Sequence, residues 1–308
     1  MNQLKGKLKK NIKKGVLTVL ATTLGVATLL GNSFSSIEAE ASVYTQSAYT
    51  QTIPDTVAGS NYAILINQAT GEVVAQKNGD AVMYPASMTK VMTILVAAEH
   101  VTNLADTVVI TQDIIDYCKA NDCSTVGFTA GETVTVMDLM WGTILPSGAD
   151  AAIALGRYVA GSDDAFVAMM NEKAASLGLQ NTHFTNCIGL YDANHYTTCN
   201  DMAAIMNAAT QNQLALTVLA TQNYTTTPTA YHPYGVSLTN LFLQRFNSLS
   251  TSGVIFAAKT GYISESKYCA VSYYIAESGT PYICVTGMTT SAWNAVYDHQ
   301  AIYTVYAQ

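Results

Sequence analysis

Segments typical of β-strands lie at both ends of this chain, and segments typical of helices lie between them. Residues 61–77 hold two short apolar runs on either side of a turn that contains Gly71, which is the pattern of a β-hairpin. Three further β-rich stretches lie near the end of the chain, at 254–259, 268–276 and 282–288. Because both groups can join one antiparallel sheet, the helical middle of the chain is left to cover it. This order predicts an α+β fold.

The middle of the chain predicts a mostly helical subdomain inserted between the two groups of strands. Apolar residues at helical spacing follow Ser87 and indicate a buried helix. Further helices are expected at 136–145, 149–160, 163–177 and 201–209, and another, at 292–306, closes the chain. Ser162 can cap the helix that starts at Asp163, and Gly178 can end it.

The first 41 residues have the order of a secretory signal peptide. A cationic stretch over 1–14 precedes an apolar run from Val16 to Leu30, and a polar segment then ends in Ala39-Glu40-Ala41. The apolar run is short for a membrane span, which leaves an uncleaved N-terminal anchor as the alternative. The order predicts cleavage before Ser42 and a secreted, extracellular protein.

The residues after the signal predict a linker over 42–57, which is polar and contains Pro54, and one folded domain over 58–308. Outside residues 1–41 the chain has eight Lys and Arg residues against 19 Asp and Glu residues. So few cations cannot form a basic patch of useful size. Neither nucleic acid nor anionic lipid is therefore expected as a partner.

Six cysteines follow the signal peptide, and they fall into close sequential pairs. Because an exported location permits disulfides, the expected bridges are Cys118–Cys123, Cys187–Cys199 and Cys269–Cys284. The alternative is that some of the six are small buried thiols. No C-x-x-C is present and the five histidines do not cluster with the cysteines, so neither a metal site nor another cofactor is expected.

The segment Ser87-Met88-Thr89-Lys90 offers a nucleophile and a base on one helix. Residues three apart lie on the same helical face. A serine hydroxyl needs a base to take its proton, and a lysine whose pKa is lowered by burial can be that base. The same spacing recurs at Ser264 and Lys267, so the pattern alone is weak.

Two further segments carry candidate polar groups. Lys259-Thr260-Gly261 follows an apolar run and offers an ammonium group, a hydroxyl and a glycine beside which a ligand backbone can lie closely. Pro146-Ser147-Gly148 separates two helices and can aim the Ser147 hydroxyl into a cleft. A surface strand end and a plain interhelical turn are the alternatives.

The three motifs, in this order, resemble those of the active-site serine penicilloyl transferases. More narrowly, the chain is similar to low-molecular-mass penicillin-binding proteins that are D-alanyl-D-alanine carboxypeptidases. The segments that carry this narrower resemblance are P-A-S-M-T-K at 85–90, L-P-S-G-A-D-A-A at 145–152, G-L-Y-D-A-N-H-Y-T-T at 189–198, D-M-A at 201–203 and A-K-T-G-Y at 258–262. The resemblance covers residues 58–308.

The resemblance implies a β-lactamase/transpeptidase-like fold and an acyl-transfer cycle on peptidoglycan stem peptides, with β-lactams as inhibitors. Ser87 would attack the penultimate D-Ala carbonyl, with Lys90 as general base and Ser147 in the proton relay to the leaving amine. Lys259, Thr260 and Gly261 would hold the terminal carboxylate and backbone, and the amides of Ser87 and Tyr262 would form the oxyanion hole. His195 would lie near the cleft with the substrate-binding residues. A cell-wall-associated protein is implied. Many relatives add a C-terminal β domain and a C-terminal membrane anchor, and neither is expected for this chain.

Three departures from the family pattern concern substrate recognition. Ala149 stands where an Asn amide usually bonds the substrate backbone, and Ile263 stands where Thr is common. Many relatives have an Arg downstream of K-T-G, but no Arg follows Arg245 here, and only Lys267 could substitute. Losing one such hydrogen bond should cost about 1–3 kcal/mol of binding.

Three other functions compete with this prediction. A class A β-lactamase would need a deacylating Glu, but residues 181–186 contain no acid. A non-catalytic or weakly active wall-binding module would explain Ala149 and the missing Arg. A peptidase with a Ser-His-Asp triad would be expected to show G-x-S-x-G, which is absent.

Overall fold

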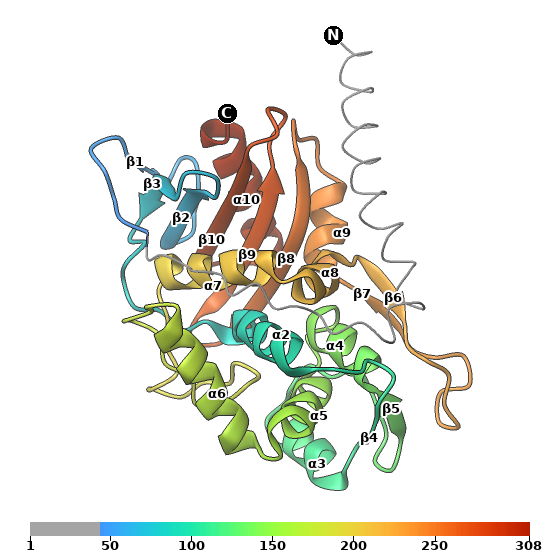
Figure 1. Cartoon of the computed structure of the whole chain (residues 1–308). Coiled ribbons are helices and arrows are strands. Elements are labelled where there is room, and N and C mark those ends of the chain that lie inside the picture. Colours follow the sequence, from blue (N-terminus) through green and yellow to red (C-terminus); the bar gives the residue numbers. More distant parts are fainter. Residues whose placement is uncertain (1–43) are drawn as a thin grey trace.

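A six-stranded sheet forms the centre of the computed structural model, which describes residues 44–308 (Figure 1). Across the sheet the strands are β1 (Gln51–Thr52), β3 (Glu72–Lys77), β2 (Tyr62–Asn67), β10 (Pro281–Thr289), β9 (Lys267–Ile275) and β8 (Val254–Ile263). Neighbouring strands are antiparallel except β1 and β3. The prediction that the first hairpin and the last three strands share one sheet is confirmed.

The two faces of the sheet bury two separate apolar cores, because alternate residues of each strand point to opposite faces. Ile64 and Ile66 of β2 pack on the side of α7 (Cys199–Gln211), whereas Leu65 packs on the side of α10 (Ala292–Tyr306). Figure 1 shows α7 and α8 (Gln213–Ala220) crossing one face, with α10 behind the other.

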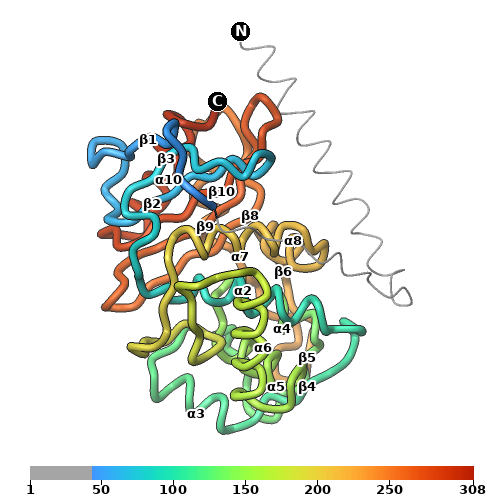
Figure 2. The backbone as a smooth tube through the Cα atoms, turned by 60° about the vertical axis from the view of Figure 1, so that its left-hand side comes forward, coloured from blue at the N-terminus to red at the C-terminus, as the bar shows by residue number. Residues whose placement is uncertain are grey.

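A mostly helical lobe adjoins the sheet, as predicted, and is seen below it in Figure 2. The lobe contains β4 (Thr107–Val109), α3 (Gln112–Ala120), β5 (Thr133–Thr135), α4 (Val136–Ile144), α5 (Ala149–Ala160) and α6 (Asp163–Ser176). The Ser162 hydroxyl accepts the Ala165 N–H at the start of α6, as its cap position predicts. Between lobe and sheet lies α2 (Thr89–His100), of which ten of twelve residues are buried.

The segment between α8 and β8 forms an arm that the sequence did not predict. It contains the two-stranded ribbon of β6 (Asn223–Thr225) and β7 (Ser237–Thr239), followed by α9 (Leu241–Asn247). Glu132 of the lobe, which is buried, accepts hydrogen bonds from Thr229 and His232 of the arm.

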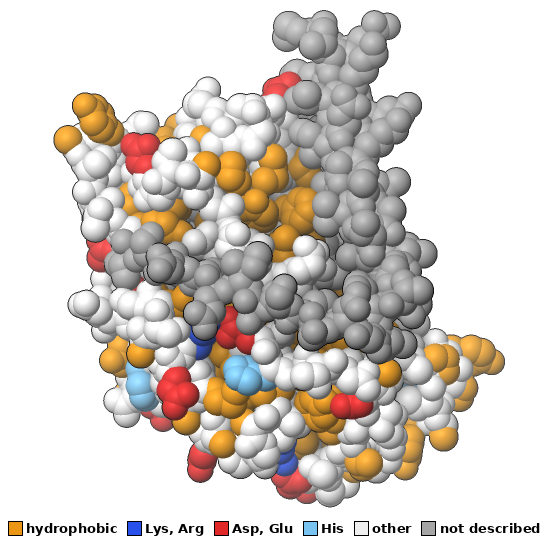
Figure 3. Space-filling model, in the orientation of Figure 1, with side chains coloured by type: hydrophobic (Ala, Val, Ile, Leu, Met, Phe, Trp, Pro, Cys, Tyr) orange, Lys and Arg blue, Asp and Glu red, His pale blue; other side chains and the backbone are white. Residues whose placement is uncertain are grey.

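In Figure 3 cationic side chains are sparse on the surface that grey atoms leave visible.

The prediction of a linker over 42–57 is wrong from residue 44 onward. Tyr44 and Ile53 are buried, and β1 pairs with β3. The Asn200 side chain fastens this segment, since it accepts the Tyr44 N–H at 3.1 Å and donates to the Tyr44 carbonyl at 2.6 Å. The polar composition reflects a short edge strand rather than a flexible connection.

The predicted signal peptide, residues 1–41, lies outside the described residues. Among 44–308, no helix is both long and apolar enough to span a membrane.

The predicted disulfides are also wrong, because all six cysteines are free thiols. Cys269 packs in the core on the α7 side of the sheet and Cys284 in the core on the α10 side, so the sheet separates them. Cys187 Sγ lies against the Ala152 carbonyl oxygen, whereas Cys199 Sγ lies 3.8 Å from Met83 Sδ. Cys118 and Cys123 lie side by side as thiols, with the Cys123 N–H on the Cys118 carbonyl. Closeness in sequence therefore did not predict a disulfide, even for Cys118 and Cys123, which are neighbours in space.

Two buried histidines contribute polar contacts to the fold. His299 contacts the Ser272 hydroxyl through Nδ1 at 2.7 Å and the Thr286 hydroxyl through Nε2 at 3.0 Å, between α10 and the sheet. Burial lowers the pKa of His299 to about 3 and the pKa of His195 to about 4. Both rings are therefore neutral near pH 7 in the folded chain.

These histidines predict that stability falls in mild acid. Their folded pKa values lie below the unfolded value of about 6.5, so the unfolded chain binds two protons that the folded chain does not. The free energy of unfolding, measured by urea titration, should fall by about 2 kcal/mol between about pH 7 and about pH 5.5. The exposed His100→Gln variant should show the same fall. A free energy of unfolding that stays constant or rises would contradict the neutral, buried state of both rings.

Candidate active site

The candidate nucleophile lies on a tight turn that leads into α2. The turn is a 3₁₀ segment, η2 (Ala86–Met88), and α2 begins directly after it. Ala86 has φ +46°, a left-handed conformation that is costly for a residue with a side chain. A Cβ on Gly189 would lie 1.9 Å from the Ala86 carbonyl oxygen, so only glycine lets the 188–190 segment pack against this turn.

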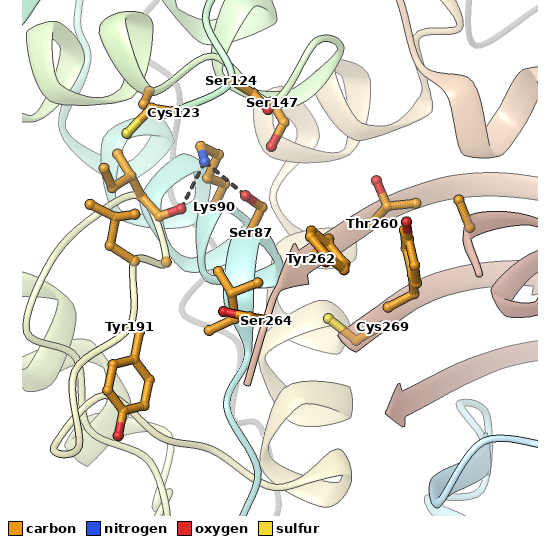
Figure 4. A pocket seen from close by; sticks show the side chains of 18 of the residues that line it. Ser87, Lys90, Cys123, Ser124, Ser147, Tyr191, Thr260, Tyr262, Ser264 and Cys269 are labelled. Atoms are coloured by element: carbon orange, nitrogen blue, oxygen red, sulfur yellow. Dashed lines mark hydrogen bonds between the residues drawn. The ribbon is translucent and has the colours of Figure 1, made fainter. Parts of the chain in front are cut away.

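The side chain of Lys90 lies one helical turn from Ser87 and points at it (Figure 4). Lys90 is 2% exposed, and its Nζ lies 3.1 Å from Ser87 Oγ and 2.7 Å from the Ile188 carbonyl oxygen. Burial lowers the pKa of Lys90 to about 8, against the smaller opposing effect of nearby thiols. A neutral lysine that can accept the Ser87 proton is therefore available just above neutral pH.

A second lysine–serine pair faces the first. Lys259 on β8 donates from Nζ to Ser147 Oγ at 2.9 Å and to the Thr260 carbonyl at 2.7 Å. Burial lowers the pKa of Lys259 well below its usual value, and the charge of Lys90 adds to this effect. Ser147 has φ +63° in the turn between α4 and α5, and its hydroxyl bonds to Lys259 Nζ.

The two pairs border a cleft of about 680 Å³. The predicted site residues that line it are Ser87, Lys90, Ser147, Thr260, Gly261 and Tyr262. Lys259 lies behind this surface and reaches the cleft through Ser147. The other lining residues include Cys123, Ser124, Ala149, Leu190, Tyr191, Ser264, Glu265 and Tyr268. In Figure 4, Thr260 and Tyr262 on β8 lie on one side of Ser87, with Ser147 and Ser124 above it.

His195 does not lie among the cleft residues, contrary to its prediction as a substrate-binding residue. It is 2% exposed and packs behind α2, where its Nδ1 accepts the Thr185 N–H at 3.1 Å. Because the ring is neutral, Nε2 carries the proton and donates to Thr89 Oγ1 at 2.8 Å. His195 therefore fixes the start of α2, two residues after Ser87.

Gly261 lines the cleft and also has a role within the fold. A Cβ at this position would lie 2.7 Å from Cys269 Sγ and 2.9 Å from the Pro85 carbonyl oxygen. The absence of a side chain therefore lets β8 pack against the turn that carries Ser87.

Asp150 anchors one wall of the cleft from within the protein. Its carboxylate is buried and accepts the N–H groups of Val126, Gly127 and Phe128, and the Ala149 N–H donates to the Ser124 carbonyl. Burial raises the pKa of Asp150, and these backbone donors oppose that effect. This role of Asp150 was not identified from the sequence.

The structure also places Arg245 in the cleft wall, which the sequence did not indicate because α9 was not predicted. Lys267, which the sequence offered as a substitute for the arginine that many relatives have after K-T-G, lies at the exposed turn between β8 and β9. Among residues 44–308, no group of three or more His, Cys, Asp or Glu side chains is arranged to hold a metal ion.

We predict that Asp150→Asn loosens the cleft wall. An amide retains one acceptor and turns a donor toward backbone N–H groups, which should lower the free energy of unfolding by about 1–3 kcal/mol. Hydrogen exchange at the amides of 126–128 should become faster. The matched control is Asp164→Asn, which alters an exposed carboxylate on α6. Unchanged exchange at 126–128 would show that Asp150 does not anchor this segment.

Comparison with known proteins agrees with this geometry. The model of the peptidase S11 family, described as D-alanyl-D-alanine carboxypeptidase, matches residues 47–288. D-alanyl-D-alanine carboxypeptidase DacF of Bacillus subtilis is 32% identical over 217 residues, which cover 67% of this chain and 52% of DacF. The D-alanyl-D-alanine carboxypeptidase of Streptomyces sp. K15 is 34% identical over 227 residues, covering 71% of this chain and 77% of that protein.

The fold agrees as well. The crystal structure of the Streptomyces K15 DD-transpeptidase superposes with a TM-score of 0.74 at 29% identity, covering 82% of this chain and 98% of that one. This chain thus spans about half the length of DacF and most of the Streptomyces structure. Together with the two lysine–serine pairs at the cleft, these matches show that the chain belongs to the D-alanyl-D-alanine carboxypeptidase family of serine hydrolases.

Proposed function

We propose that the protein is a serine carboxypeptidase that removes the terminal D-Ala from peptidoglycan stem pentapeptides and is acylated by β-lactams. The observation that carries this proposal is the bond between Lys90 and Ser87 at the cleft, where burial holds the pKa of Lys90 near 8. Family membership supports the substrate class. The N-terminal sequence, with its order of a signal peptide over 1–41, supports export to the cell wall.

Acylation starts when neutral Lys90 takes the proton from Ser87 Oγ. The oxygen then attacks the carbonyl of the penultimate D-Ala, and the amides of Ser87 and Tyr262 stabilise the resulting oxyanion. The proton held by Lys90 then passes through the Ser147 hydroxyl, which Lys259 holds in place, to the amine of the departing D-Ala as the peptide C–N bond breaks. Water then hydrolyses the acyl-enzyme, which restores Ser87 and leaves a shortened stem peptide.

Substrate binding uses the edge of the cleft that β8 forms. Thr260 offers a hydroxyl to the terminal carboxylate, and the amino group of the preceding residue, Lys259, bonds to the Thr260 carbonyl and to Ser147. Ala149 lines the cleft with a methyl group, so it donates no hydrogen bond to the substrate backbone. The proposal is therefore an enzyme with an intact nucleophile and base but fewer substrate contacts. A non-catalytic wall-binding module would not require the contacts that hold Lys90 and Lys259 to their serines.

The proposal predicts D-Ala release with a defined pH dependence. For an acyl-D-Ala-D-Ala peptide, kcat/KM should rise with pH and reach half its maximum near the Lys90 pKa of about 8, because only the neutral amine accepts the proton. Ser87→Ala should lose about a thousandfold or more, whereas Ser278→Ala, in the exposed turn between β9 and β10, should not. Release that persists in Ser87→Ala, or a rate that does not change between about pH 6 and about pH 9, would contradict the mechanism.

A further inference from the structure

An arginine with no acidic partner among residues 44–308 lines the catalytic cleft. Arg245 lines the cleft together with Leu241 of α9 and two alanines of α10, Ala292 and Ala295. Its guanidinium carbon lies 5.5 Å from the centre of the Trp293 ring, a cation–π contact that orients the group without neutralising it. Within residues 44–308 the salt bridges involve other cations. A guanidinium held in this way is available to bind an anion.

Thr260 points to the side of the sheet that α9, the helix of Arg245, covers. The alternation of side chains along β8 shows this. Lys259 points toward the helical lobe, where it bonds to Ser147. The next residue, Thr260, therefore points to the opposite face, on which Ala258 packs with α9 and α10. Figure 1 shows α9 beside β8 at the edge of the sheet.

A side-chain contact holds α9 at this position. Asn240 caps the helix by accepting the N–H groups of Phe242 and Leu243, and its Nδ2 donates to the Ala258 carbonyl at 2.9 Å. Asn240 is 4% exposed, so this contact is shielded from water. The contact links the helix that carries Arg245 to the strand that carries Thr260, two residues after Ala258.

We propose that Arg245 binds the terminal carboxylate of the peptide substrate together with the Thr260 hydroxyl. Two parallel N–H···O bonds from a guanidinium suit a carboxylate. This inference rests on the proposed function, because it assigns a residue for the leaving D-Ala at the same site. In this chain the arginine comes from α9, which precedes Lys259 in the sequence. In many relatives an arginine follows the K-T-G motif instead. The site would thereby select peptides that end in a free carboxylate.

The test compares two thioesters that differ only in this charge, an N-acyl-D-alanyl thioglycolate and its methyl ester. Thioesters react readily, so both can be followed with the wild-type protein. Arg245→Gln should lower kcat/KM by about 10- to 100-fold for the acid and by less than about threefold for the ester. Trp293→Ala should lower the value for the acid by a smaller factor, because the charge remains but its orientation is lost. Lys267→Gln, at the exposed turn, is the matched control and should change neither.

The outcomes separate this inference from the proposed function. Equal losses for both thioesters in Arg245→Gln, or no loss for the acid, would overturn the role of Arg245 and leave the peptidase in place. A lysine at this position, Arg245→Lys, should restore part of the preference for the acid, since it restores the charge without the fork of two donors. If the wild-type protein hydrolysed neither thioester, the proposed function would be overturned, and this inference with it. Thermal unfolding of each variant shows whether it remains folded.

Discussion

Two lysine side chains buried beside two serines are the feature on which the rest of the site depends. Removing an ammonium group from water costs several kcal/mol unless it is hydrogen-bonded, and burial here instead lowers the pKa of both lysines. Each Nζ is held by one backbone carbonyl, that of Ile188 for Lys90 and that of Thr260 for Lys259. The remaining donors and lone pairs are directed at Ser87 and Ser147. Chemistry at the cleft therefore follows from where the fold places these two carbonyls.

Much of the structure around the pairs serves to hold strained or polar backbone in place. Ala86 and Ser147 both adopt positive φ, which persists only where surrounding contacts enforce it. Gly189 and Gly261 pack without side chains against the turn of Ala86, and the Gly148 N–H donates to the Gly142 carbonyl beside Ser147. His195 and Asp150 act one layer further out. They fix the start of α2 and the 126–128 segment by hydrogen bonds that water does not reach.

Local patterns in the sequence predict local structure well and distant contacts poorly. Periodicity predicts the helix at 292–306 and places Ser87 and Lys90 on the same helical face. The structure reproduces both. The predicted Cys269–Cys284 bridge failed because the two faces of the sheet separate residues that are close in sequence. Arg245 was missed because α9 has only seven residues, too few for a clear apolar period. His195 was misplaced because no local pattern tells which side of α2 its loop covers.

The central claim is that Ser87 is a nucleophile activated by Lys90 in a cleft that accepts acyl-D-Ala-D-Ala-like groups. It is tested most directly by the intact mass of the protein after incubation with benzylpenicillin, followed by peptide mapping. The account predicts an adduct of one drug molecule per chain, located on Ser87 and absent from Ser87→Ala. An unmodified mass in the wild-type protein, or an adduct that maps to another residue, would contradict it.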